Sequence, residues 1–293
     1  MSVCTLCPRA CGVDRETSLG FCGVRWNPNI ARAALHFWEE PSISGPRGSG
    51  AVFFCGCNLA CVFCQNRAIN HALVGPEADA EALAAIMLSL QKSGAHNVNL
   101  VSPAPFAPIL REAIPRAREM GLIIPIVYNT NAYEKVETLR SLSSLVDVYL
   151  PDLKYVSTLI AAKYSGAADY FTFASRAVEE MFAQCGPLIT NGEGIAVRGV
   201  IIRHLVLPGS VDETRRVVDH IASNFPPDTA LSLMGQYVPN GGSLPAPLER
   251  RLLRREYDRA IDYALQRGLT NVLVQELSSA SLDFTPEFDG RVP

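Results

Sequence analysis

The chain has 293 residues, of which 48% are hydrophobic and 19% charged, so it can bury a sizeable core and is not a disordered protein. Its formal net charge of −3 gives no overall attraction to nucleic acid or to an anionic membrane, and we expect neither as a partner. No run of 18 or more apolar residues indicates a membrane span, and the first residues lack the pattern of a secretory signal, so we expect a cytoplasmic protein.

Cysteines are concentrated near the start of the sequence. Eight of the nine lie within the first 64 residues, and such clustering in a cytoplasmic chain points to metal rather than to disulfides. Residues 1–48, rich in proline and glycine, read as an irregular metal-binding segment that packs on a domain formed by residues 49–293.

From Ala51 onward, apolar strand patterns alternate with helical patterns. Strands are predicted near 51–55, 98–101, 124–128, 146–150, 198–207, 230–234 and 271–275, and helices near 79–93, 107–120, 134–144, 157–164, 174–184, 212–224 and 248–267. This alternation predicts about six βαβ units and a parallel sheet, which closes most naturally into a partial or complete α/β barrel.

Polar residues follow several predicted strands, at the end where such folds gather their chemistry. They are Cys57 after the first strand, Ser102 after the second, Asn129 and Asn131 after the third, and Asp152 and Lys154 after the fourth. This row predicts one wall of an active site. The alternative for the charged residues is a surface ion-pair network, which their apolar flanking sequence disfavours.

Cys57, Cys61 and Cys64, the cysteine triad, have the spacing C-x3-C-x2-C directly after the first strand. Three thiolates can hold three corners of a [4Fe–4S] cluster and leave the fourth iron open to another ligand. The alternatives are a zinc site or a group of buried structural cysteines.

The triad in this context resembles that of the radical S-adenosylmethionine (SAM) superfamily, and the similarity runs from Cys4 to Phe288. It is closest to poorly characterised proteins related to the pyruvate formate-lyase activating enzyme. The stretches that carry it are CTLCPRACGV, HFWEEPSISG, GSGAVFFCGCNLACVFCQN, PIVYNTNAYE, VDVYLPDLKY, RGVIIRHLVLPG and LMGQYVP. The resemblance implies a partial (β/α)6 TIM-like barrel with an N-terminal cysteine-rich segment. It also implies reductive cleavage of SAM to a 5′-deoxyadenosyl radical, which takes hydrogen from a substrate.

The resemblance assigns roles by position. Phe63 would lie beside the adenine, and Asn129 and Asn131 would line the SAM pocket. Asp152 and Lys154 match an Asp-x-Lys near SAM and the reacting hydrogen, which makes them the predicted catalytic residues.

Two further positions concern the orientation of SAM. Arg203 would reach the SAM carboxylate, whereas its neighbour His204 should point to the opposite face of the strand. Ser102 stands where relatives often carry the Gly-Gly-Glu that binds the SAM amino group, and its oxygen or nearby carbonyls would replace that motif.

Cys4, Cys7, Cys11 and Cys22, the N-terminal cysteine set, fit a second iron–sulfur cluster or a structural zinc, which spacing does not separate. Unligated cysteines are the remaining alternative. Activating enzymes often carry extra clusters in an insert after the triad, whereas this set precedes it.

The family resemblance also implies a low-potential reductant such as flavodoxin or ferredoxin. The substrate is a glycine of a partner protein, a peptide or a small molecule. A non-catalytic metal-binding interaction module is the alternative from a different class.

Overall fold

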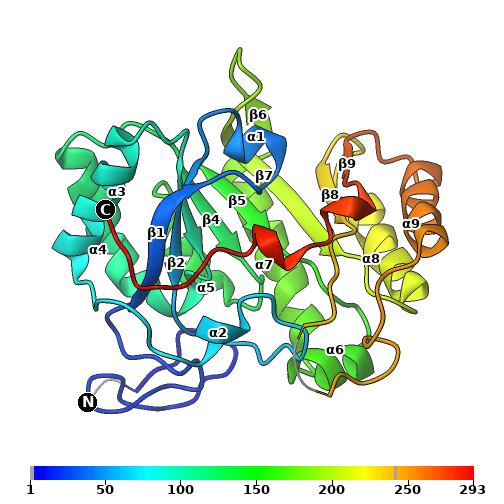
Figure 1. The fold of residues 1–293 in the computed structure, drawn as a ribbon, viewed down its shortest axis with the longest axis horizontal. Helices are drawn as coiled ribbons and strands as arrows, with labels where there is room; N and C mark the ends of the chain where they lie inside the picture. The colour runs from blue at the N-terminus through cyan, green and yellow to red at the C-terminus, as the bar shows by residue number, and fades with distance from the viewer. Residues whose placement is uncertain (1–2, 241–242) are drawn as a thin grey trace.

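The computed structural model describes residues 3–240 and 243–293, which form a largely parallel sheet surrounded by helices (Figure 1). The parallel strands follow one another in chain order as β2 (Ser49–Phe54), β3 (Val98–Val101), β4 (Ile126–Thr130), β5 (Val148–Pro151), β7 (Ala196–Leu205), β8 (Ala230–Met234) and β9 (Val272–Val274). The antiparallel strand β1 (Ile30–His36) flanks β2, and the short β6 (Ile189–Thr190) pairs with β7. The predicted α/β class is therefore confirmed.

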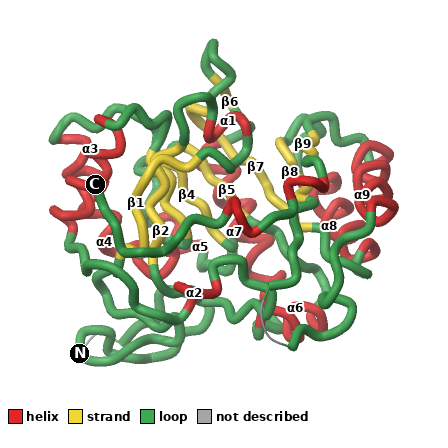
Figure 2. The backbone as a smooth tube through the Cα atoms, in the orientation of Figure 1, coloured by secondary structure: helices red, strands yellow, loops and turns green. Residues whose placement is uncertain are grey.

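The helices cover the outside of the sheet and connect its strands (Figure 2). They are α1 (Pro41–Ser44), α2 (Arg67–Asn70), α3 (Ala80–Lys92), α4 (Ala107–Glu119), α5 (Val136–Arg140), α6 (Thr158–Ser165), α7 (Tyr170–Cys185), α8 (Val211–Asn224) and α9 (Arg254–Gln266). Local sequence sets several boundaries: Asp79 accepts a hydrogen bond from the amide of Ala82 to cap α3, and Gly166 ends α6 in a left-handed conformation. Among the helices that the structure describes, none is long and apolar enough to cross a membrane.

The sequence prediction is wrong for Ile30–His36, which we expected to be irregular. This segment forms β1 and pairs with β2 from Ile30 opposite Phe54 to His36 opposite Ser49. Pro28 and Pro41 bound the strand rather than interrupt it. The hydrogen bonds that stabilise it come from a partner farther along the chain, which local periodicity does not reveal.

The sheet is an open, partial barrel. In the described residues β1 and β9 are its two edges, and no strand pairing joins them. Instead, the C-terminal segment, red in Figure 1, crosses from β9 to β1. The amide of Gly290 donates to the carbonyl of Ala31 at 2.9 Å, and that of Ala33 donates to the carbonyl of Arg291 at 2.9 Å. Irregular chain thus spans the gap.

Helix α1 covers the end of the barrel at which the parallel strands begin (Figure 1). The side chain of Asn97, just before β3, donates to the carbonyl of Ile43 at 2.7 Å and accepts from Ser49 Oγ at 2.6 Å. Because Glu39 and Glu40 directly precede α1, this packing brings two carboxylates to the barrel interior.

Candidate active site

A cleft of about 240 Å³ opens where the parallel strands end, and every residue predicted for SAM, catalysis and the triad lines it. These residues are Cys57, Cys61, Phe63, Cys64, Ser102, Asn129, Asn131, Asp152, Lys154 and Arg203. The geometry therefore assembles the predicted set in one place, while the individual roles stay predictions.

The triad lies in the loop that leaves β2. The amide of Leu59 points at Cys57 Sγ at 3.4 Å, and Cys61 Sγ lies 2.9 Å from Ser165 Oγ. Burial and then the neighbouring thiols raise the pKa of Cys57 to about 11 and that of Cys64 to about 12. Three crowded, half-buried thiols with raised pKa values suit a metal cofactor, whose positive charge would stabilise them as thiolates.

The arrangement of these sulfur atoms bears on the kind of metal. In the part of the chain that the structure describes, no three Cys, His, Asp or Glu side chains converge closely enough to hold one metal ion. A zinc ion draws its ligands to a single point, whereas the thiolates of a cubane each bind a different iron and stand farther apart. The triad's donor set of three thiols is one that an iron–sulfur cluster accepts.

Amide side chains join the end of β4 to the triad loop. Asn131 Nδ2 lies 3.2 Å from Cys57 Sγ and 2.8 Å from Asn58 Oδ1, and Asn58 Nδ2 donates to the carbonyl of Tyr133 at 2.6 Å. Phe63 is buried beside these groups, with its ring against Tyr237. The ends of β2 and β4, which flank β3 in the sheet, are thereby held in a fixed relation around the triad.

Arg203 is the centre of a buried ion-pair network. Its guanidinium donates to Asp152 Oδ1 at 2.9 Å, to Glu39 Oε2 at 3.2 Å and to Asn129 Oδ1. Burial would lower the pKa of Arg203, but the carboxylates of Asp152, Glu40 and Glu39 outweigh it and raise that pKa. The guanidinium stays charged; its Nη2 also lies 2.9 Å from Asp152 Oδ1, so within the described residues one of its five N–H donors is left for a ligand.

Lys154 completes the network, with its Nζ 2.7 Å from Asp152 Oδ2. Burial would raise the pKa of Asp152, but Arg203 and Lys154 together lower it, so its carboxylate stays ionised. Since the side chains of Asp152, Lys154 and Arg203 are only 11–17% exposed, the surface-network alternative is wrong. These charges are fixed at the wall of the cleft.

Glu39 is a site residue that the sequence did not single out. Its Oε1 accepts from Asn99 and Asn129, both at 3.1 Å, in addition to the contact with Arg203. Glu39 follows the antiparallel strand β1 and lies on the side of the barrel where the parallel strands begin. A search limited to residues that follow parallel strands therefore misses it. In the sequence, Glu39 is marked only by its place in HFWEEPSISG, one of the stretches that carry the family resemblance.

The backbone is unusual at two positions next to the cleft. Ser102 and Ala132 have φ angles of 61°, in the left-handed region that non-glycine residues rarely adopt. Ser102 also donates its amide to the carbonyl of Asn129 at 3.0 Å. Such conformations persist when the surrounding contacts hold them, and they often mark ligand sites.

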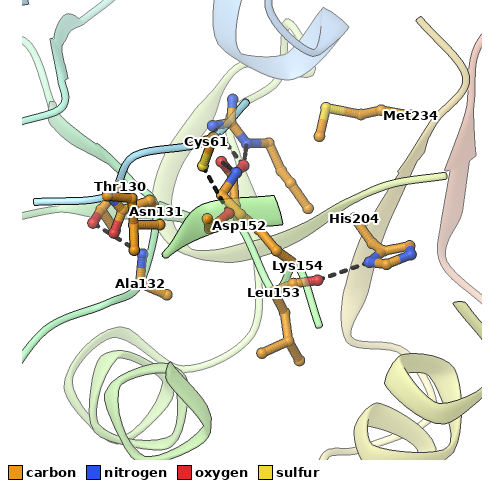
Figure 3. A network of polar contacts seen from close by, with 12 residues as sticks. Cys61, Thr130, Asn131, Ala132, Asp152, Leu153, Lys154, His204 and Met234 are labelled. Carbon is orange, nitrogen blue, oxygen red and sulfur yellow. Dashed lines mark hydrogen bonds and ion pairs between the residues drawn. The ribbon is translucent and has the colours of Figure 1, made fainter. Parts of the chain in front are cut away.

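His204 points away from the cleft, as predicted from strand alternation (Figure 3). Its Nδ1 donates to the carbonyl of Leu153 at 2.7 Å, and its Nε2 lies 2.9 Å from Thr214 Oγ1. Burial lowers the pKa of His204 to about 4, so the ring is neutral and holds the turn between Asp152 and Lys154. Cys185 is buried in α7 and does not line the cleft.

Residues 51–222 match the sequence pattern of the Radical SAM superfamily. The chain is also 31% identical over 279 residues to "Uncharacterized protein MJ0674" from Methanocaldococcus jannaschii, with 91% of this chain and 75% of that protein covered. The chain belongs to the radical SAM superfamily, and family membership implies an enzyme that uses SAM and a [4Fe–4S] cluster.

Solved structures agree on the fold. Streptococcus suis SuiB bound to S-adenosylmethionine superposes with a TM-score of 0.52 at 16% sequence identity, over 76% of this chain and 49% of SuiB. SuiB bound to precursor peptide SuiA gives a TM-score of 0.51 at 17% identity, over 76% of this chain and 48% of that protein. This chain therefore spans about half the length of SuiB.

The triad fits the family's cluster by donor type, proximity and hydrogen bonding to sulfur. When bound, the cluster supplies the electron that cleaves SAM reductively to methionine and the 5′-deoxyadenosyl radical. The protein's own share is to hold the strand ends, keep Arg203 and Lys154 charged, and surround SAM with buried side chains.

Proposed function

We propose that this protein uses the 5′-deoxyadenosyl radical to take a hydrogen atom from a polypeptide. The reaction we favour is activation of a glycine in a partner protein, as expected of a relative of the pyruvate formate-lyase activating enzyme. Radical modification of a peptide is the nearest alternative, and a small-molecule substrate is the second.

The observation that carries this proposal is the open side of the barrel. Between β1 and β9 the wall of the cleft is formed by chain that belongs to no strand; Phe284, at the end of the 3-10 helix Leu282–Phe284, lines the cleft with Thr285 and Pro286. Such a segment can be displaced without separating paired strands. An extended substrate segment therefore has a lateral route to Asp152 and Lys154.

The charges of the cleft also favour a polypeptide. Within the described lining, Arg203 and Lys154 are both paired with carboxylates. These two cations therefore add no net positive charge that would attract a phosphorylated or acidic metabolite. The rest of the lining includes the amides of Gln236 and Asn240. Amide groups of this kind complement the backbone of a peptide.

SuiB, which has the same fold, has been solved with its precursor peptide SuiA, so this architecture admits a peptide. In our proposal SAM is bound by Phe63, Ser102, Asn129 and Asn131, together with the remaining N–H group of Arg203. Asp152 and Lys154 lie nearest the reacting hydrogen. A low-potential one-electron donor such as flavodoxin reduces the enzyme.

The test is anaerobic incubation of the reduced enzyme with SAM and polypeptides deuterated at glycine Cα. We expect deuterium in 5′-deoxyadenosine from the deuterated polypeptide, and a glycyl doublet in the electron paramagnetic resonance spectrum when the same polypeptide carries ordinary hydrogen at glycine Cα. Lys154→Met should lose this transfer, whereas the matched variant Lys163→Met, on the exposed side of α6, should keep it. Deuterium arriving only from a free metabolite would contradict the proposal.

A further inference from the structure

The four residues of the N-terminal cysteine set lie in loops that are hydrogen-bonded to one another. The amide of Cys4 donates to the carbonyl of Val13 at 2.9 Å, and the amide of Gly12 donates back to the carbonyl of Cys4 at 3.1 Å. Cys11 and Cys4 are hydrogen-bonded through their thiols, and the thiols of Cys7 and Cys22 are close enough to influence each other electrostatically. The segment before β1 thus forms a second group of four thiols.

These thiols share a local backbone pattern with the triad. In each case a sulfur lies beside the amide two residues farther along the chain; in the triad the amide of Leu59 donates to Cys57 Sγ at 3.4 Å. The pattern holds for Cys7, Cys11 and Cys22 in the N-terminal cysteine set, and for Cys57 and Cys64 in the triad. The same turn therefore recurs in the set that the superfamily assigns to a cluster and in the set that it does not.

The segment also leaves room between its sulfur atoms. A methyl group at Gly20 would lie 3.2 Å from Cys22 Sγ and 3.7 Å from Cys11 Sγ, so a side chain there would intrude between the two thiols. Glycine at this position keeps that space open.

A buried cation lies beside the set. Arg15 is 1% exposed and donates to the carbonyls of Val24 at 3.3 Å, Pro105 at 2.7 Å and Arg25, while its guanidinium stacks on Trp26. Among residues 3–240 and 243–293, no carboxylate forms an ion pair with it. A buried charge needs a counter-charge, and four thiolates around iron and sulfide carry a net negative charge that supplies one.

The N-terminal cysteine set is joined directly to the triad loop. The amide of Cys57 donates to the carbonyl of Cys22 at 3.2 Å, and the side chain of Asn58 is hydrogen-bonded to the thiol of Cys7. Asn58 in turn accepts from Asn131, whose amide group also contacts Cys57 Sγ. Two routes of hydrogen bonds therefore connect the two groups of thiols.

We propose that the N-terminal cysteine set binds a second iron–sulfur cluster that passes electrons from a low-potential one-electron donor to the cluster of the triad. The donor loses one electron, the second cluster gains it and then returns to its oxidised state as the triad's cluster is reduced, with no bond made or broken. Zinc has no redox chemistry and could not serve as this relay. The relay rests on the proposed function; the presence of a second cluster does not.

The first experiment is metal analysis of the variant in which all three triad cysteines are replaced by Ala, purified anaerobically. It should retain about four irons with equimolar sulfide, and a signal in the electron paramagnetic resonance spectrum after reduction. Adding Cys4→Ala and Cys7→Ala should remove them, whereas adding Cys185→Ala should not. A triad variant that holds no iron, or holds zinc instead, overturns the proposal.

A second pair of variants covers the event that the triad variant misfolds. Gly20→Ala should lower total iron from about eight to about four per chain, because its methyl group crowds two thiols. Gly192→Ala, where an added methyl group meets nothing within 4 Å, should keep the full content. Equal iron in both variants overturns the proposal.

The relay is tested by the ratio of two rates of 5′-deoxyadenosine formation, one driven by flavodoxin and one by dithionite. This ratio should fall in the Cys4→Ala/Cys7→Ala variant and stay constant in Cys185→Ala; an unchanged ratio in the former overturns the relay. If the wild type forms no 5′-deoxyadenosine with either reductant, the proposed function fails, while the iron content of the triad variant still decides the second cluster.

Discussion

Glu134, directly after β4, provides a quantitative test of the structure around the cleft. Its carboxyl is 1% exposed and accepts hydrogen bonds from Tyr128 Oη at 2.8 Å and Thr130 Oγ1 at 2.5 Å. Burial raises the pKa of Glu134 to about 7, although both hydroxyl donors act in the opposite direction. The folded protein therefore keeps this proton up to neutral pH, whereas the unfolded chain releases it near the ordinary glutamate value of 4.5.

The consequence for stability has a definite sign. A carboxyl whose pKa is raised by folding favours the folded state below the unfolded pKa, and this contribution is lost as pH rises through the folded pKa. The gap between 4.5 and about 7 corresponds to a total of about 3 kcal/mol at 1.36 kcal/mol per pKa unit. Most of it, about 2.5 kcal/mol, falls between about pH 5 and about pH 8.

Glu134→Gln stays neutral at every pH and keeps the size of the side chain. Its free energy of unfolding, relative to the wild type, should therefore rise by about 2.5 kcal/mol between about pH 5 and about pH 8. The measurement is anaerobic urea unfolding followed by circular dichroism at several pH values. The exposed Glu137→Gln should show no such rise. Parallel stability curves for Glu134→Gln and the wild type would refute a buried, protonated Glu134.

Three further outcomes are expected. Replacing the triad cysteines with Ala should abolish reductive SAM cleavage and remove about four irons. Cleavage that persists in this variant would show that the triad does not hold the cluster that cleaves SAM. Arg203→Ala should weaken SAM binding more than Lys154→Ala, because the remaining N–H group of Arg203 offers a charge-assisted hydrogen bond worth about 1.5–3 kcal/mol; equal affinities in calorimetry would contradict this. Tyr170→Phe should lower the free energy of unfolding by about 1 kcal/mol, because the hydroxyl that contacts the carbonyls of Asn131 and Asp152 is lost, and an unchanged urea midpoint would show those contacts to be energetically neutral.

The sequence by itself determined the order of strands and helices and the position of the triad. These features depend on local pattern: a short, largely apolar run, as in Val98–Val101, indicates a strand, and a helical period closed by Gly94 indicates a helix. Because parallel strands end at the same edge of a sheet, the positions of Asn129 and Asp152 also predicted that they would share a cleft, and the structure places them there. Helix boundaries were less secure, and α9 begins at Arg254 rather than near 248.

Only the tertiary structure decided the pairing of β1, the entry of Glu39 and the link between the two groups of cysteines. Glu39 meets Arg203 although 164 residues separate them, because α1 closes the far end of the barrel. Asn58 connects Cys7 to Asn131 across loops that no local period relates. Contacts of this kind form where folding brings together segments that are far apart in the sequence. A pattern among neighbouring residues does not indicate which distant segment each of them will meet.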